Sequence, residues 1–99
     1  MSRYEEFLRS DRRLCILRLL TEINGSANES VLHSGLEALG HVRIPRDEIR
    51  KDIRFLIDNG CATNEWYGDL QVVFITRRGV EVAEGRLGVE GIKKPSIGV

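Results

Sequence analysis

The sequence predicts a mainly α-helical domain that carries one small β-hairpin. Three successive segments place apolar residues at the three- and four-residue spacing of amphipathic helices. The period then changes to the alternation typical of strands, and a last short helix follows. The chain has 99 residues, which is enough for one domain of this kind and not for two.

The chain opens with a short helical extension, which we assign to residues 1–9. Its apolar residues have helical spacing, and they are Tyr4, Phe7 and Leu8. Because this stretch lies before the first strongly apolar helix, we expect it to lie outside the central domain.

The first helix of the domain is predicted to begin near residue 10. Ser10 or Asp11 could cap it, and Asn24-Gly25 would end it. Its apolar side chains cover more than half of its circumference, namely Cys15, Ile16, Leu17, Leu19, Leu20 and Ile23. A helix of this kind is buried on several sides, so it is either the central helix or also the seam of a dimer.

The second helix has two possible starts. Ser26 and Glu29 fit the capping-box spacing, and Asn28 is an equally good cap for a slightly later start. One apolar stripe follows, made of Val31, Leu32, Leu36 and Leu39. Gly40 is expected to end the helix.

The third helix is predicted to begin at Pro45, which suits the first position of a helix. Asp47 and Glu48 in its first turn complement the helix dipole. Its buried stripe is expected to contain Ile49, Ile53, Leu56 and Ile57. Asn59-Gly60 would end it.

Two strands are predicted over residues 61–67 and 70–76, joined by a turn at Gly68-Asp69. Thr76 would cap a last helix that runs to about Leu87 with Val80 and Ala83 facing inward. Residues 88–99 are rich in glycine and have no period, so we expect a flexible tail.

This order of elements defines the winged helix-turn-helix arrangement. It comprises a three-helix core, a two-stranded wing and a short C-terminal helix. The predicted organisation is therefore an extension (residues 1–9), a winged-helix domain (residues 10–87) and a tail (residues 88–99).

Two segments resemble a known family. Asp11–Leu17 is similar to the first helix of many small winged-helix transcription regulators, and Ile75–Ala83 to the way such domains leave the wing. Over about residues 10–95 the chain resembles short winged-helix proteins of Mu-like phages and prophages, which are often labelled ArsR-like regulators. The resemblance implies a DNA-binding transcriptional regulator. The sequence lacks the paired cysteines of an ArsR metal sensor, and its wing tip has no Arg or Lys.

In a helix-turn-helix, the N-terminal part of the second helix of the motif meets base edges in the major groove. Here that recognition helix is the third helix. The basic candidates for DNA contact are Arg43, Arg46, Arg50, Lys51 and Arg54. Arginine can bond guanine in two places, and lysine pairs with phosphates. The alternative is a solvated helix face, because Asp47, Glu48, Asp52 and Asp58 balance the charge.

Trp66 and Tyr67 near the wing tip are further candidates for contact with DNA. Either aromatic ring could stack on a base, lie along a backbone or anchor a protein partner. The alternative is that one of them folds back over the hairpin.

Composition limits the possible functions. Lys plus Arg and Asp plus Glu number 15 each, so the overall field attracts no polyanion. We expect a homodimer on double-stranded DNA, and the alternative is a protein-interaction module that binds no DNA. The dimer seam would be the first helix or the segment with Tyr4, Phe7 and Leu8.

Other classes of function find little support in the sequence. We find no phosphate loop, nucleophile elbow or zinc-protease motif, and so expect neither an enzyme nor a cofactor. The soft ligands Cys15, His33, His41 and Cys61 match no zinc spacing, so no metal site is predicted. A metal or redox sensor using Cys15 or Cys61 is a third alternative. No leader and no apolar run of membrane-spanning length is visible, so we expect a cytoplasmic protein with reduced thiols.

Overall fold

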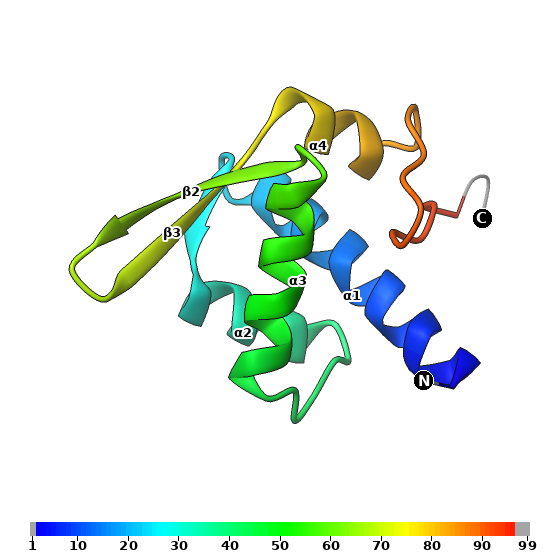
Figure 1. Ribbon diagram of the computed structural model, residues 1–99, viewed down its shortest axis with the longest axis horizontal. Helices are drawn as coiled ribbons and strands as arrows, with labels where there is room; N and C mark the ends of the chain where they lie inside the picture. The colour runs from blue at the N-terminus through cyan, green and yellow to red at the C-terminus, as the bar shows by residue number, and fades with distance from the viewer. Residues whose placement is uncertain (1, 97–99) are drawn as a thin grey trace.

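The computed structural model describes residues 2–96, which form four helices and one antiparallel three-stranded sheet (Figure 1). In chain order the elements are α1 (Arg3–Glu22), β1 (Ser26–Asn28), α2 (Glu29–Ala38), α3 (Arg46–Asp58), β2 (Ala62–Tyr67), β3 (Leu70–Ile75) and α4 (Arg77–Ala83). The predicted order of helices and hairpin is present, with β1 added.

Helix α1 is a single helix of 20 residues. The prediction that the first helix of the domain begins near residue 10, separate from an extension over residues 1–9, is therefore wrong. The Ser2 hydroxyl accepts a hydrogen bond from the Glu5 N–H at 3.1 Å, and neither Ser10 nor Asp11 is a cap. The helix runs through because the segment contains no Gly or Pro. Within residues 2–96, neither α1 nor any other helix is long and apolar enough to cross a membrane.

Strand β1 was not predicted, and it changes both the second helix and the sheet. Ser26 belongs to β1, and Asn28 caps α2 by accepting a hydrogen bond from the Val31 N–H at 2.9 Å. This is the later of the two predicted starts. Strand β1 pairs with β3, Ala27 opposite Val73, which gives the order β1-β3-β2. The sheet therefore has three strands instead of two, because β3 has a second edge that a neighbouring segment can pair with.

The β2–β3 hairpin has the predicted turn at Gly68-Asp69 and reaches out beyond the helices (Figure 1). The Thr76 hydroxyl caps α4, as predicted, by accepting a hydrogen bond from the Gly79 N–H at 3.1 Å. However, α4 ends at Ala83, before the left-handed Gly85. Ala83 is buried on this helix, as predicted, and so is Val82, whereas Val80 is half-buried.

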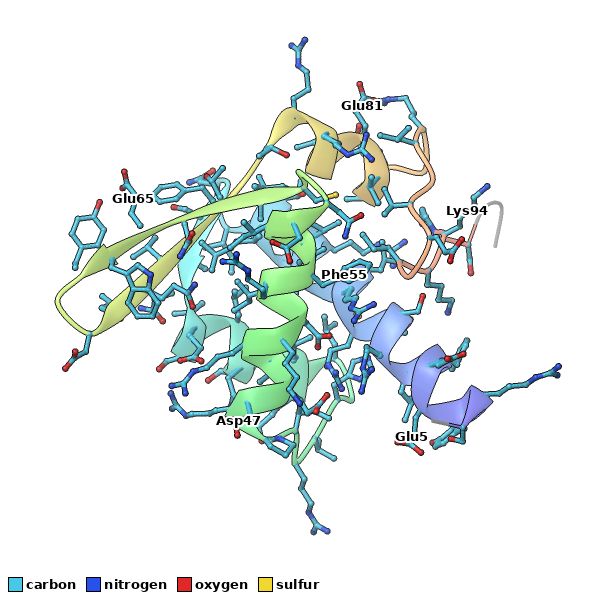
Figure 2. All side chains as sticks on the ribbon, viewed as in Figure 1. Glu5, Asp47, Phe55, Glu65, Glu81 and Lys94 are labelled. Atoms are coloured by element: carbon cyan, nitrogen blue, oxygen red, sulfur yellow. The ribbon has the colours of Figure 1, made fainter. Side chains whose placement is uncertain are left out.

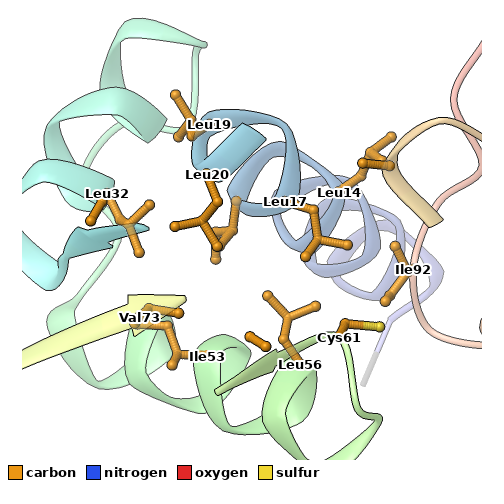
Figure 3. Packing of buried hydrophobic residues seen from close by; sticks show 14 of the residues in the cluster. Leu14, Leu17, Leu19, Leu20, Leu32, Ile53, Leu56, Cys61, Val73 and Ile92 are labelled. Atoms are coloured by element: carbon orange, nitrogen blue, oxygen red, sulfur yellow. The ribbon is translucent and has the colours of Figure 1, made fainter. Parts of the chain in front are cut away.

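The core contains residues from more elements than the three predicted core helices (Figure 3). Helix α1 supplies five of its buried apolar residues, Leu14, Ile16, Leu17, Leu19 and Leu20. The sheet, α4 and the C-terminal segment add others, among them Val73, Val82 and Ile92. On α2 only Leu32 and Leu36 are buried, while Val31 and Leu39 of the predicted stripe are exposed. The apolar face of α1 is therefore occupied within the domain and is not free to form a dimer seam.

The segment after α4 is packed on α1, against the prediction of a flexible tail. Within residues 88–96 there is no helix or strand, but Ile92 is only 5% exposed. The Arg13 guanidinium donates a hydrogen bond to the Gly91 carbonyl at 3.1 Å, and the Lys93 N–H donates to the Ser10 carbonyl at 3.2 Å. Residues 97–99 of the predicted tail lie outside the described residues.

A buried charge cluster holds α3 against α1. Asp52 of α3 is fully buried and forms ion pairs with Arg12 and Arg13 of α1, the latter with 3.1 Å between Nε and Oδ1. The Arg13 guanidinium also lies over the Phe55 ring, 3.7 Å from its centroid. The expectation that Asp52 is one of the surface carboxylates of α3 is therefore wrong, because the helix turns Asp52 toward the two arginines.

Candidate nucleic-acid interface

Helix α3 exposes the basic face that the sequence predicted. Ile49, Ile53 and Leu56 face the core, and Ile57 is half-buried. Between 55% and 73% of each basic side chain is exposed, for Arg46, Arg50, Lys51 and Arg54. Figure 2 shows α3 with its side chains, with Asp47 labelled near the N-terminal end of the helix and Phe55 farther along it.

Each of these cations also has a carboxylate nearby. Lys51 Nζ lies 3.4 Å from Glu48 Oε1, and Arg54 Nε lies 3.2 Å from Asp58 Oδ1. These two pairs lie within α3 itself and are exposed, so water screens them and each contributes little to stability. The helix face is therefore both exposed and locally neutral.

Glu29 of α2 pairs with two arginines of α3. Its Oε1 lies 2.6 Å from Arg50 Nε, and its Oε2 lies 3.6 Å from a terminal nitrogen of Arg46. The side chain of Glu29 is only 12% exposed, and its hydrogen bond raises the pKa of the Arg50 guanidinium. This carboxylate, from a neighbouring helix, thus offsets part of the positive charge of Arg46 and Arg50.

A hollow of about 210 Å³ lies between α3 and the β2–β3 hairpin. Its lining residues are Arg50, Arg54, Ile57, Asn64, Trp66 and Gln71. Three of the predicted contact residues, Arg50, Arg54 and Trp66, are therefore brought to one place. The other four predicted contact residues do not line the hollow: Arg43, Arg46, Lys51 and Tyr67.

Arg43 and Tyr67 lie outside this hollow. Arg43 is exposed in the loop before α3 and has a left-handed backbone, with φ 58°. The Tyr67 hydroxyl donates a hydrogen bond to Glu65 at 2.8 Å, which raises the pKa of Tyr67. Trp66 is 60% exposed and Tyr67 59% exposed, so neither ring folds back over the hairpin.

Three residues of this region were not among the predicted contact residues. Asn64 and Gln71 could have been found, because the turn at Gly68-Asp69 fixes the register that sets Gln71 opposite Trp66. Glu29 had no such signal. It precedes Arg50 by 21 residues and meets it only through the packing of α2 on α3.

The two thiols lie apart from this face. Burial raises the pKa of Cys15 to about 11 and also raises the pKa of Cys61. Both thiols are therefore protonated near neutral pH, which weakens the redox-sensor alternative, since the thiolate is the reactive form. Cys15 and His41 lie together with Asp11, whereas Cys61 and His33 are not part of that group.

Sequence comparison finds two relatives that span nearly the whole chain. The uncharacterized protein gp26 of Escherichia phage Mu is 44% identical over 90 residues, which cover 91% of this chain and 93% of gp26. An uncharacterized protein of Haemophilus influenzae is 34% identical over 93 residues, which cover 93% of this chain and 90% of that protein. No family model matches the chain.

Two solved structures share the fold. F93 from STIV, a winged-helix DNA-binding protein, has a TM-score of 0.62 at 24% identity, over 72% of this chain and 77% of F93. A structure of the DNA recognition and protein interaction domains of HOP2 has a TM-score of 0.57 at 20% identity, over 66% of this chain and 98% of that one. The chain therefore has a winged-helix fold.

Proposed function

The chain belongs to the family of gp26 of phage Mu, and on that premise we propose that it binds double-stranded DNA as a phage or prophage transcriptional regulator. Helix α3 lies in the major groove and the hairpin lies along the flanking backbone. The protein acts in the cytoplasm and is not an enzyme. The earlier resemblance to ArsR-like regulators and the fold of F93 both support a DNA-binding role.

The observation that carries this proposal is the hollow between α3 and the hairpin. Arg50 and Arg54 reach it from the helix, and Trp66 reaches it from the hairpin. Guanidinium groups can bond guanine edges or phosphates, while the indole supplies a surface for stacking. Asn64 and Gln71 add amide donors and acceptors to the same place.

The carboxylates around α3 tune this binding. Arg46 and Arg50 must exchange Glu29 for phosphate or base edges when DNA binds. Breaking the pairs with Glu29 offsets part of the electrostatic free energy gained from the phosphates. Because the chain also has zero net charge, its affinity for non-specific DNA is modest. A homodimer on a two-fold symmetric site then provides the contacts that one domain lacks.

The test is an anisotropy titration of a labelled mixed-sequence duplex, repeated at rising salt. We expect a dissociation constant of about 10⁻⁴ to 10⁻⁶ M at physiological salt, weakening steeply as salt rises. Arg50→Ala and Arg54→Ala should each weaken binding by about 1–3 kcal/mol. The matched control is Arg86→Ala, which removes another exposed arginine that pairs with two carboxylates, Glu81 and Glu84.

The outcomes separate clearly. Weakening by the two α3 variants but not by Arg86→Ala supports the assignment of α3. Binding that is equal for all three variants and the parent overturns the assignment of α3. Absence of binding even at low salt overturns DNA binding itself.

One observation favours a second function, that of a protein-interaction module. The cations of α3 are paired, and the hairpin tip exposes apolar side chains, with Trp66 60%, Tyr67 59% and Leu70 45% exposed. Exposed aromatic residues are frequent anchors of protein interfaces. This alternative requires that Trp66→Ala releases a protein partner in a pulldown and that no salt-dependent DNA affinity exists.

A further inference from the structure

We propose that Asp11, Cys15 and His41 form a zinc-binding site where α1 meets the loop between α2 and α3. The site lies outside the candidate DNA interface, and the proposal does not depend on DNA binding. The three residues offer one carboxylate oxygen, one sulfur and one imidazole nitrogen, and these ligand atoms all lie within 4.8 Å of one another.

The local geometry follows from two elements. Asp11 and Cys15 are four residues apart on α1 and therefore share one face of the helix, with 3.8 Å between Sγ and Oδ2. His41 comes from the loop after α2, and its Nε2 lies 2.7 Å from the same Oδ2. A hydrogen bond from the His41 N–H to the Leu36 carbonyl, 2.9 Å long, holds the loop there.

These separations are close to those of a tetrahedral zinc site. Zinc binds sulfur at about 2.3 Å and nitrogen or oxygen at about 2.0–2.2 Å, so neighbouring ligand atoms lie roughly 3.3–3.8 Å apart. The sulfur–oxygen distance already has this value. The nitrogen–oxygen distance needs to open by less than ~1 Å, which a side-chain rotation provides. Three protein ligands leave the fourth position for water or another ligand.

The donor set selects zinc among the common divalent cations. A thiolate and an imidazole suit zinc, whereas magnesium and calcium prefer oxygen ligands. Binding breaks the S–H bond of Cys15, forms the zinc–sulfur bond and releases the proton to solvent. The neutral His41 ring binds zinc through Nε2 and carries its own proton on Nδ1, so the Nε2 contact with Asp11 is replaced by the zinc–nitrogen bond. The thiolate and the Asp11 carboxylate then balance the two charges of the ion.

The surroundings keep the ligands in place. The His41 side chain is 8% exposed and Cys15 is half-buried, so little water competes for the site. Lys93 Nζ lies 3.3 Å from the other carboxylate oxygen, Oδ1 of Asp11. That contact leaves Oδ2 directed at His41 and Cys15. Lys93 thus holds the orientation of the carboxylate that binds the metal.

The test uses the full chain and metal salts alone. Zinc is titrated in competition with a chromophoric chelator, and cobalt(II) is titrated as a spectroscopic substitute. We expect one zinc per chain with a dissociation constant on the order of 1 μM or tighter. Cobalt should give the visible bands of a tetrahedral site and a near-ultraviolet thiolate charge-transfer band. A parent protein that binds no stoichiometric zinc overturns the proposal.

Matched variants identify the ligands. Cys15→Ser should remove the charge-transfer band and weaken zinc binding by about 100-fold, whereas Cys61→Ala should retain both. His41→Gln should weaken zinc binding similarly, with His33→Gln as its control. Melting in the presence of a chelator shows whether each variant is folded. A folded Cys15→Ser protein that keeps the affinity and the spectrum of the parent also overturns the proposal.

Discussion

Glu29 at the start of α2 forms an ion pair with Arg50 of α3, with 2.6 Å between Oε1 and Nε. The same carboxylate lies 3.6 Å from Arg46, so one acidic residue holds two of the proposed DNA contacts. Removing its charge should free both arginines without removing any cation.

We therefore expect Glu29→Gln to tighten DNA binding by about threefold to tenfold, because the arginines no longer exchange a carboxylate for a phosphate. The measurement is the same anisotropy titration at fixed salt. Glu22→Gln on α1 is the control, since it changes the net charge equally and Glu22 has no ion pair among residues 2–96. An equal gain in both variants would mean that only net charge matters.

Asp52 should be far more important for stability than its neighbours on α3. Asp52→Asn removes the counter-charge of the half-buried Arg13 and leaves the buried Arg12 only its 3.4 Å pair with Glu48, and we expect a loss of about 3–5 kcal/mol in the free energy of unfolding. Urea denaturation measures it. Asp58→Asn, which breaks only the exposed pair with Arg54, should cost less than about 0.5 kcal/mol. Equal losses would contradict the burial of Asp52.

Gly79 allows α4 to pack closely on the backbone of Cys61, the residue just before β2. A Cβ at this position would lie 2.2 Å from the Cys61 carbonyl oxygen and 2.7 Å from Ile75 Cγ1. Because backbone must move, Gly79→Ala should cost at least about 2 kcal/mol in thermal or urea unfolding. Gly35→Ala is the comparison. There the three nearest atoms all belong to the Leu19 side chain, with its two methyl carbons at 2.8 Å, so a side chain and not the backbone must shift, and alanine favours the helix by about 1 kcal/mol. A Gly79→Ala protein as stable as Gly35→Ala would refute the close approach.

The N-terminal turns of α1 are the remaining candidate for the seam of the proposed homodimer. Tyr4 is 69% exposed and Phe7 is 53% exposed, whereas the apolar face farther along α1 is buried. We expect the double variant Tyr4→Ser, Phe7→Ser to sediment as a monomer at a concentration where the parent is a dimer. Trp66→Ser removes an equally exposed aromatic residue and should remain dimeric. A double variant that keeps the parent's mass would place the seam elsewhere.

Local patterns predicted the parts of the fold that depend on a few neighbouring residues. The stripe of Ile49, Ile53 and Leu56 placed the basic face of α3 correctly, and the cap at Thr76 marked the start of α4. The turn at Gly68-Asp69 fixed the hairpin, and hence the position of Trp66 near its tip. These features follow from helix periodicity, side-chain caps and turn geometry, all of which are visible in sequence.

The features that the sequence did not predict are long-range. Strand β1 exists because β3 offers it an edge, and Asp52 is buried because α1 brings two arginines to it. Likewise Glu29 reaches Arg50, and His41 reaches Asp11, only after the helices have packed. None of these contacts has a periodic signal, since each joins residues far apart in the chain.

The packing of Ile92 has a consequence for how the protein is made. This side chain completes the core between α1 and α4, although it is added to the chain after every helix and strand of the domain. Helix α1 is synthesised first, but part of its apolar face stays uncovered until residue 92 has emerged. The domain therefore completes its core only after residue 92 has left the ribosome, and until then a nascent chain exposes a surface that molecular chaperones recognise.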